Sequence, residues 1–142
     1  MAENQYDHYL EHGDTPLTRA SRHGDLQKVI ELLEAGANVN FRENPHMTNY
    51  SALHQACLGE RFEIVKVLLA AGAEIDPYCA YSGGGTPLHS ACKGNNVEIV
   101  QYLLDHGANI NAKDLQSRTP LAHARIYKNA AIIKILLERG AE

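Results

Sequence analysis

The stretch TPLHSACKGNNVEIVQYLLDHGANINAKD, from Thr86 to Asp114, decides the fold, because the rest of the chain repeats it with variations. Related copies begin at Thr15, Ser51 and Thr119, so successive copies start 36, 35 and 33 residues apart. A period of roughly 20–50 residues that carries two helical patterns is typical of a solenoid, in which each unit packs against its neighbours. The sequence therefore predicts a stack of four similar units.

Each copy predicts two short helices. A Thr or Ser at the first position can accept a hydrogen bond from an amide of the first helical turn, and the Pro that usually follows is tolerated there because its missing N–H would have no partner. Apolar residues at helical spacing then mark a second helix. In the copy that starts at Thr86, this second helix ends in the pair Leu103-Leu104, and Gly107 stops it.

The composition favours a small soluble domain. The chain has 142 residues, with 13 Lys and Arg against 17 Asp and Glu, a net charge of −4. Binding to nucleic acid in general needs clustered positive charge, which this balance does not supply. The N-terminus has no leader pattern, and the longest apolar stretch, 67–73, is too short to span a bilayer. We therefore expect a monomer in the cytoplasm and/or nucleus, with no nucleic-acid or membrane partner.

Three features of these copies resemble the ankyrin repeat: TPLH at 86–89, the Leu-Leu-x-x-Gly-Ala signature in every copy, and Val-Asn or Ile-Asn at 39–40 and 110–111. The resemblance covers residues 13–142 and leaves 1–12 as an N-terminal extension. It implies an all-α solenoid of four helix-turn-helix repeats joined by β-turn or hairpin loops. The repeats would span about 13–48, 49–83, 84–116 and 117–142.

The resemblance also implies a function, namely recognition of another protein by a scaffold or adaptor without catalysis. In this family the partner meets the first helices of the repeats, on the concave face, and the loop tips. Transferred position by position, this surface holds Arg19, Arg22, Gln55, Leu58, Ser90, Lys93, Arg118, His123 and Ile126, with Met47, Tyr50, Tyr78 and Tyr81 in or beside two lengthened loops. The mixture of basic and apolar residues predicts a groove for an acidic segment with a hydrophobic anchor. The alternative is an ordinary solvated surface with tolerated loop insertions.

Two further functions remain open. One is a substrate-recruiting or targeting domain of a larger regulatory assembly, of the ligase-adaptor or phosphatase-targeting type. The other is a metal protein, because His54, Cys57, His89 and Cys92 form two H-x-x-C pairs that could supply four zinc ligands. The resemblance instead implies that each of these histidines holds a turn against the neighbouring repeat. No catalytic motif is present, so we expect no enzymatic activity and no cofactor.

Three smaller expectations concern loops and ends. Cys79, in a loop, should be the most reactive thiol. Ser117 stands where earlier copies have Gly or Asn, so the last turn should differ in shape. The first repeat carries Lys28 and Glu31 where the others are apolar, as an N-terminal cap should. The last repeat keeps Ile132 and Ile135, so either Lys128, Asn129, Lys134 and Glu138 cover it or the natural chain continues.

Overall fold

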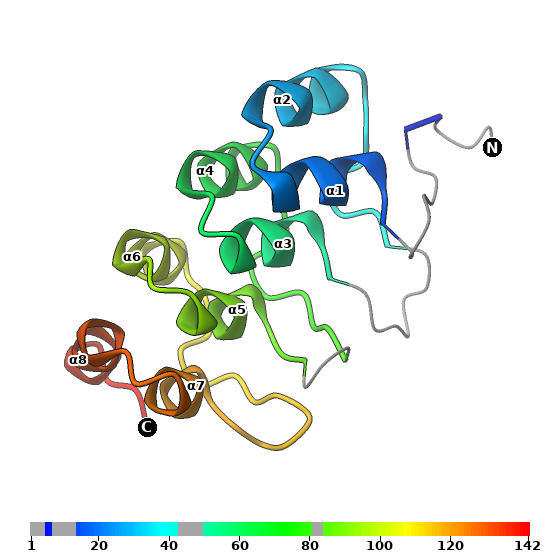
Figure 1. The fold of residues 1–142 in the computed structure, drawn as a ribbon. Coiled ribbons are helices and arrows are strands. Elements are labelled where there is room, and N and C mark those ends of the chain that lie inside the picture. Colours follow the sequence, from blue (N-terminus) through cyan, green and yellow to red (C-terminus); the bar gives the residue numbers. More distant parts are fainter. Residues whose placement is uncertain (1–4, 7–13, 43–49, 81–83) are drawn as a thin grey trace.

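The computed structural model describes residues 5–6, 14–42, 50–80 and 84–142. These segments contain eight helices, which are α1 (Pro16–His23), α2 (Leu26–Glu34), α3 (Ala52–Leu58), α4 (Phe62–Ala70), α5 (Pro87–Lys93), α6 (Val97–Asp105), α7 (Pro120–Ile126) and α8 (Ala130–Glu138). Figure 1 shows them as two rows, with α1, α3, α5 and α7 in one and α2, α4, α6 and α8 in the other. We call the first row the inner helices and the second the outer helices. The predicted all-α solenoid is confirmed.

The helices begin where the cap residues predict. Thr15, Ser51 and Thr119 each accept a hydrogen bond from the backbone amide three residues on. Three of the outer helices are capped in the same way by Asp25, Asn96 and Asn129. The exception is α4, whose cap residue Arg61 makes no such bond. A side-chain cap stabilises a helix by about 1 kcal/mol, which matters for helices as short as these.

The core is a strip between the two rows of helices. In the outer helices Val65, Val100 and Leu103 are all 0% exposed, and in the inner helices Leu88 is also 0% exposed. Where successive inner helices pack together, each carries a buried alanine, such as Ala56 at 0% exposure. A larger side chain there would force the helices apart.

Polar side chains link the loops of successive repeats. The residue that ends a repeat accepts a hydrogen bond from a backbone amide at the end of the next one, as in Asn40 with Glu74 (2.8 Å), Asp76 with Asn109 (3.0 Å) and Asn111 with Glu142 (3.0 Å). Because these bonds recur at one position, they hold the repeats in a fixed register. Asn40 and Asn111 therefore serve the loop backbone, as their place in the motif implies.

The loop before α5 is closed by a backbone pairing. Cys79 and Gly85 exchange hydrogen bonds of 2.9 and 2.7 Å, and the Cys79 side chain is 0% exposed. The expectation that Cys79 is the most reactive thiol is therefore wrong, because Cys79 is as buried as Cys57 and Cys92.

The turn before α7 differs in shape from the turn before α5, as expected. The φ angle is left-handed at both Ser117 (61°) and Gly84 (69°), but the residue that follows is left-handed at Gly85 (103°) and not at Arg118. The carboxylate of Asp114 imposes the left-handed conformation of Ser117, since it accepts hydrogen bonds from the backbone amides of Gln116 (2.8 Å) and Arg118 (2.9 Å). Ser117 is thus held in a conformation that costs an ordinary residue about 1–2 kcal/mol.

Replacing Ser117 by glycine should stabilise the protein. The variant Ser117→Gly relieves the left-handed strain but adds freedom to the unfolded chain, so we expect a gain of about 0.5–1 kcal/mol in the free energy of unfolding. Urea unfolding followed by circular dichroism measures it. Gln116→Gly, where the backbone is not left-handed, is the matched control and should lose stability. A loss at both positions would contradict the strain.

The two ends of the stack differ in how they meet solvent. Lys28 of α2 is exposed, whereas Ile64, Ile99 and Ile132, at the same place in later repeats, are 2%, 1% and 0% exposed. This position therefore faces the preceding repeat. Lys28 lies at the open end of the described stack, as expected of a cap. Of the two residues expected to need an outer cover, Ile132 does not need one, because α8 packs against α6 and α7 and this residue is 0% exposed, whereas Ile135 is half-buried.

Candidate functional site

Two buried histidines shape the inner-helix side. His54 and His89 are each 0% exposed. The Nδ1 atom of His89 accepts a hydrogen bond from the Thr86 amide (3.0 Å), and that of His54 accepts one from the Ser51 amide (3.2 Å). An amide can only donate, so the ring proton lies on Nε2. The Nε2–H groups then donate to carbonyls in the next repeat, at Gly85 and Arg118, each over 3.0 Å. Each histidine thus joins a helix start to the following turn.

This use of the histidines contradicts the metal alternative. Both ring nitrogens of His54 and of His89 are occupied by the hydrogen bonds above. Cys57 and Cys92 are free and buried, and burial raises the pKa of both thiols, that of Cys92 to about 12. Zinc needs the thiolate, which such a pKa disfavours. Within the described residues, no group of three or more His, Cys, Asp or Glu side chains is placed to hold a metal.

The buried histidines make stability depend on pH. Burial lowers the pKa of His54 to about 3 and lowers that of His89 as well. The unfolded chain titrates near 6.5 and so binds more protons in this range, which means that acid favours unfolding. His54 contributes its full stabilisation above pH 6.5 and loses it progressively as the pH falls toward 3. At pH 5 the loss from His54 is about 2 kcal/mol.

Urea unfolding at pH 7.5 and pH 5.0 tests this dependence. His54→Gln should be less stable than the parent at pH 7.5, because it loses the bridging hydrogen bonds. It should also lose less stability between the two pH values. His106→Gln, on the exposed end of α6, is the control. An unchanged pH dependence in His54→Gln would show that His54 is not the group responsible.

His123 is hydrogen-bonded to the internal ion pair of Asp114 and Arg118. It is 2% exposed, and its Nε2–H donates to Asp114 over 2.7 Å, while Arg118 Nε donates to the same carboxylate over 2.9 Å. Burial alone would raise the pKa of Asp114, but the hydrogen bonds from His123 and Arg118 outweigh it and hold that pKa well below its usual range. Burial lowers the pKa of His123, and the bond to Asp114 only partly opposes this. His123 therefore stays neutral inside the fold.

The expected exposure of the fifth position in each repeat is wrong for all but the first. Gln55, Ser90 and His123 are 7%, 4% and 2% exposed, whereas Arg19 is exposed. The reason is that this position faces the preceding inner helix, and α1, α3 and α5 cover it in repeats two to four. Arg19 is exposed because no helix among the described residues precedes α1. As placed, the three buried side chains cannot meet a partner.

The eighth position and the loops are more accessible. Leu58 and Lys93 are half-buried, and Ile126 is 54% exposed. In the loops, Tyr78 is 42% exposed and Tyr50 is half-buried. Met47 and Tyr81 lie outside the described residues. A binding role for these residues remains a prediction.

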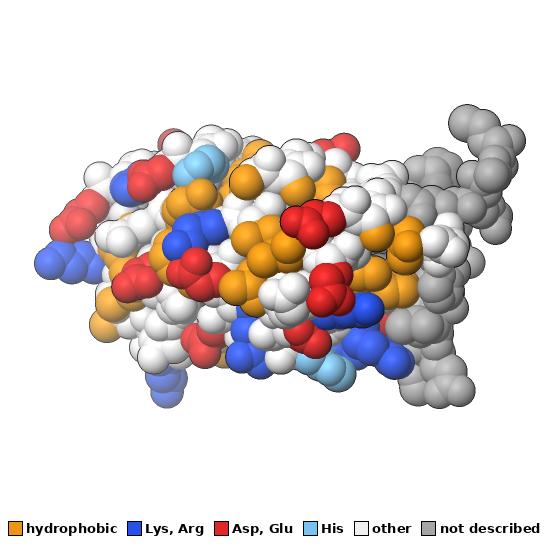
Figure 2. All heavy atoms as spheres, turned by 90° about the horizontal axis from the view of Figure 1, so that it is seen from above, with side chains coloured by type: hydrophobic (Ala, Val, Ile, Leu, Met, Phe, Trp, Pro, Cys, Tyr) orange, Lys and Arg blue, Asp and Glu red, His pale blue; other side chains and the backbone are white. Residues whose placement is uncertain are grey.

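Of the four basic residues expected on the binding surface, two form ion pairs with carboxylates of the same chain. Arg22 pairs with Asp14 over 2.6 Å, and Arg118 pairs with Asp114. In the part of the chain that the structure describes, no carboxylate pairs with Arg19 or Lys93. Figure 2 likewise shows acidic and basic side chains interspersed on the face it presents. The sequence analysis did not identify Asp14 and Asp114 as partners of these arginines. Asp14 lies eight residues before Arg22, and Asp114 lies four residues before Arg118.

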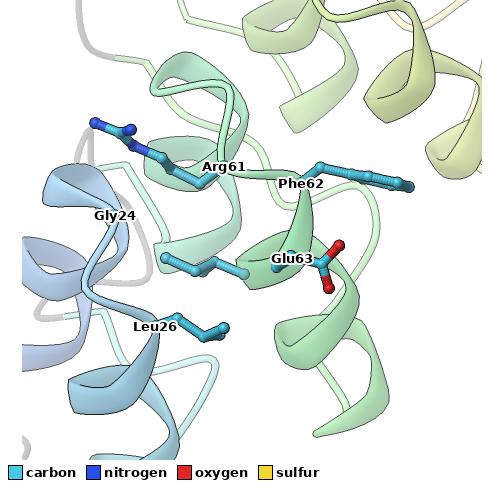
Figure 3. A pocket seen from close by; sticks show the side chains of 6 residues that line it. Gly24, Leu26, Arg61, Phe62 and Glu63 are labelled. Carbon is cyan, nitrogen blue, oxygen red and sulfur yellow. The ribbon is translucent and has the colours of Figure 1, made fainter.

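Two open pockets of about 270 Å³ were not expected from the sequence. One is lined by Gly24, Leu26, Arg61, Phe62, Glu63 and Ile64, where α2 and α4 begin. Figure 3 shows Leu26 reaching toward α4 in this pocket. The other, at the first repeat, is lined by Pro16, Arg19, Ala20, His23, Asp25 and Lys28. The periodic sequence pattern does not predict either pocket, because both pockets form where neighbouring elements meet.

The four-unit stack, its capped inner helices and its bridging histidines agree with the comparison of this sequence with known families. A family model described as ankyrin repeats (3 copies) matches residues 2–79 and 76–142. This chain belongs to the ankyrin repeat family. Ankyrin repeats generally mediate contacts between proteins, and an ankyrin repeat domain is typically non-catalytic. Among the described residues, no helix has the length and apolar character needed to cross a membrane.

Several curated proteins contain a similar stretch. Serine/threonine-protein kinase 12 of Arabidopsis thaliana is 30% identical over 130 residues, which are 92% of this chain and 20% of the kinase. Ankyrin repeat and SOCS box protein 3 of Bos taurus is 41% identical over 130 residues, or 91% of this chain and 24% of that protein. The human 2-5A-dependent ribonuclease is 41% identical over 71 residues, 50% of this chain and 9% of the ribonuclease. This ankyrin chain thus spans at most about a quarter of these relatives.

Proposed function

We propose that this ankyrin repeat chain is a non-catalytic scaffold or adaptor that binds an acidic segment of another protein along its inner helices. It would act as a monomer in the cytoplasm and/or nucleus. The observation that supports the proposal most is the row formed by the eighth position of successive repeats. This row holds Leu58, then Lys93, then Ile126, each at least partly accessible. Packing between the repeats does not require a different residue type at this position in each repeat.

The spacing of this row suggests the form of the bound segment. Packed helices lie about 8–10 Å apart, so successive side chains of the row are separated by about that distance. An extended peptide advances about 3.3 Å per residue, so about three residues span each step. The matching segment has an acidic residue in the middle, with an apolar residue about three positions to either side.

Lys93 offers the sharpest test of this proposal. A random peptide library displayed on phage and selected on the purified chain should enrich segments with that acidic and apolar spacing. Lys93→Glu should weaken the selected peptides by about tenfold, because one attractive contact becomes repulsive. Fluorescence anisotropy with labelled peptide measures the affinity.

Lys66→Glu provides the matched control on the outer row, where Lys66 pairs with Glu63 over 2.8 Å. It should leave peptide affinity unchanged. Equal loss in both variants, or selection of peptides without an acidic residue, would contradict the proposal. Arg22 is a poorer choice for reversal, since Arg22→Glu would also break the internal pair with Asp14.

A second candidate function is a substrate-recruiting or targeting domain within a larger regulatory assembly. The observation that favours it is that the similar stretch forms only 20–24% of the plant kinase and the bovine SOCS box protein. Such a domain must hold two proteins at once. Native mass spectrometry of complexes purified through the chain would then show ternary species, and Lys93→Glu would remove only one component. Complexes that are exclusively binary would argue against it.

A further inference from the structure

The last repeat presents an unusual amount of apolar surface. The described residues include five large hydrophobic side chains that are well exposed, and three of them lie in α7, the turn after it and α8. These are Ile126, Tyr127 and Leu137, at 54%, 52% and 48% exposure. Figure 1 shows α7 and α8 at the lower end of the described stack.

Comparison with the earlier repeats explains where this surface points. Val29, Val65 and Val100 are each 0% exposed, but Ile133, at the same position of α8, is only half-buried. Likewise Leu104 is half-buried, whereas Leu137 at its position is exposed. The earlier repeats therefore use these positions to pack against the repeat that follows. We call Ile126, Ile133 and Leu137 the terminal face.

The terminal face does not suit another repeat of the same kind. Where Ser21, Cys57 and Cys92 are 0–1% exposed in the earlier junctions, the last repeat has Arg125. Burying a guanidinium without a partner carries a large cost in desolvation. In addition, Ala122 stands where His54 and His89 donate to the next turn, so the last repeat lacks this link, as does the first repeat with Thr18.

The charge of the last repeat points to a different occupant. Residues 119–142 contain four basic and two acidic residues, a net charge of +2 on a chain whose total is −4. Arg139 pairs with Asp105 over 2.6 Å, and Lys134 lies 3.9 Å from Glu138. Arg125 and Lys128 have no ion pair within the described residues. Two unpaired cations therefore border the terminal face.

We propose that the terminal face binds an acidic amphipathic helix of a partner protein. Ile133 and Leu137 are four residues apart on α8, and Ala122 and Ile126 are four apart on α7. Such pairs form two ridges, and the groove between them accepts the apolar ridge of a third helix. Carboxylates on the flanks of that helix would meet Arg125 and Lys128. This surface is separate from the row of Leu58, Lys93 and Ile126 except at Ile126 itself.

Two synthetic helical peptides test the proposal directly. Both carry leucines at positions i, i+3, i+4 and i+7, and the remaining positions are rich in glutamate in one and in lysine in the other. Isothermal titration calorimetry with the chain should give an affinity about tenfold tighter for the glutamate peptide. Leu137→Ser and Arg125→Glu should each weaken its binding about tenfold.

Matched controls distinguish specific binding at the terminal face from nonspecific hydrophobic or electrostatic binding elsewhere on the chain. Leu115→Ser changes a leucine that is 56% exposed in the loop before α7, and Arg19→Glu reverses a charge at the first repeat. Neither should alter binding, and neither should Lys93→Glu, so failure here is distinct from failure of the inner-helix proposal. Equal affinity for both peptides, or equal loss in the controls, would overturn the inference.

Two further results would assign the face to another occupant and also overturn it. One is a dimer in sedimentation equilibrium that Leu137→Ser dissociates, which would make a second copy the occupant. The other is stable stacking of a copy of residues 86–118 fused after Glu142, seen as a higher urea midpoint in a single transition. The expected result is a monomer and no gain from the fused repeat.

Discussion

Leu103→Ala is expected to lower the free energy of unfolding by about 2–5 kcal/mol. Leu103 lies in α6 and is 0% exposed, in the strip between the two rows of helices. The third repeat has a neighbour on both sides, so the cavity left by truncation would weaken the contacts of α6 with α4, α5 and α8. Urea unfolding monitored by circular dichroism measures the change. A loss near 5 kcal/mol would consume a large part of the stability of a typical small domain.

The control for this prediction is Leu137→Ala. Leu137 is the second leucine of the corresponding pair in α8 and is 48% exposed. Its truncation removes little buried area and should cost less than about 1 kcal/mol. If the two variants unfold at the same urea concentration, the register of buried positions described here is wrong.

Gly84→Ala is expected to cost about 2–4 kcal/mol. A methyl group at Gly84 would lie 2.0 Å from the backbone oxygen of Cys79, an atom that cannot move aside without breaking the pairing of Cys79 with Gly85. The φ angle of 69° adds strain for any residue with a side chain. Because His54 donates to the Gly85 carbonyl, displacement of this loop would also weaken the junction between repeats two and three.

Gly72→Ala separates strain from steric conflict. Its φ angle is 92°, yet a methyl group there would meet nothing within 4 Å. This variant should cost only the conformational penalty of about 1 kcal/mol. Differential scanning calorimetry of both variants measures the difference. Equal losses at Gly84 and Gly72 would mean that the close approach to Cys79 carries no energetic weight.

The fold could be predicted from the sequence because its signals are local and occur four times. Cap residues, glycine stops and apolar spacing each act within one or two helical turns. Repetition then specifies the stack, since each unit has the same side to bury. The sequence predicted that the turn at Ser117 differs in shape but did not predict its left-handed backbone, for the opposite reason. Its backbone is set by the carboxylate of Asp114, and residue type alone did not indicate a left-handed conformation.

The candidate site could be predicted only in part. The fifth and eighth positions of the repeats both carry residues that differ from copy to copy, so the sequence does not distinguish them. Stacking does, because the preceding inner helix covers Gln55, Ser90 and His123 but leaves Ile126 exposed. The free charge was overestimated for a similar reason, since Asp14 and Asp114 meet Arg22 and Arg118 only in the folded chain.

Together with its copies, the stretch from Thr86 to Asp114 determined the number of repeats, their helices and their core positions. These features follow from the sequence because helix caps and the spacing of buried residues depend on residues close together in the chain. Only the tertiary structure decided which polar residues form hydrogen bonds and ion pairs inside the stack. It also decided that Lys93 has no ion pair among the described residues and that Arg125 borders an exposed apolar face. Those outcomes depend on which side chains the folded loops and helices bring together, and on which side of a repeat has a neighbour.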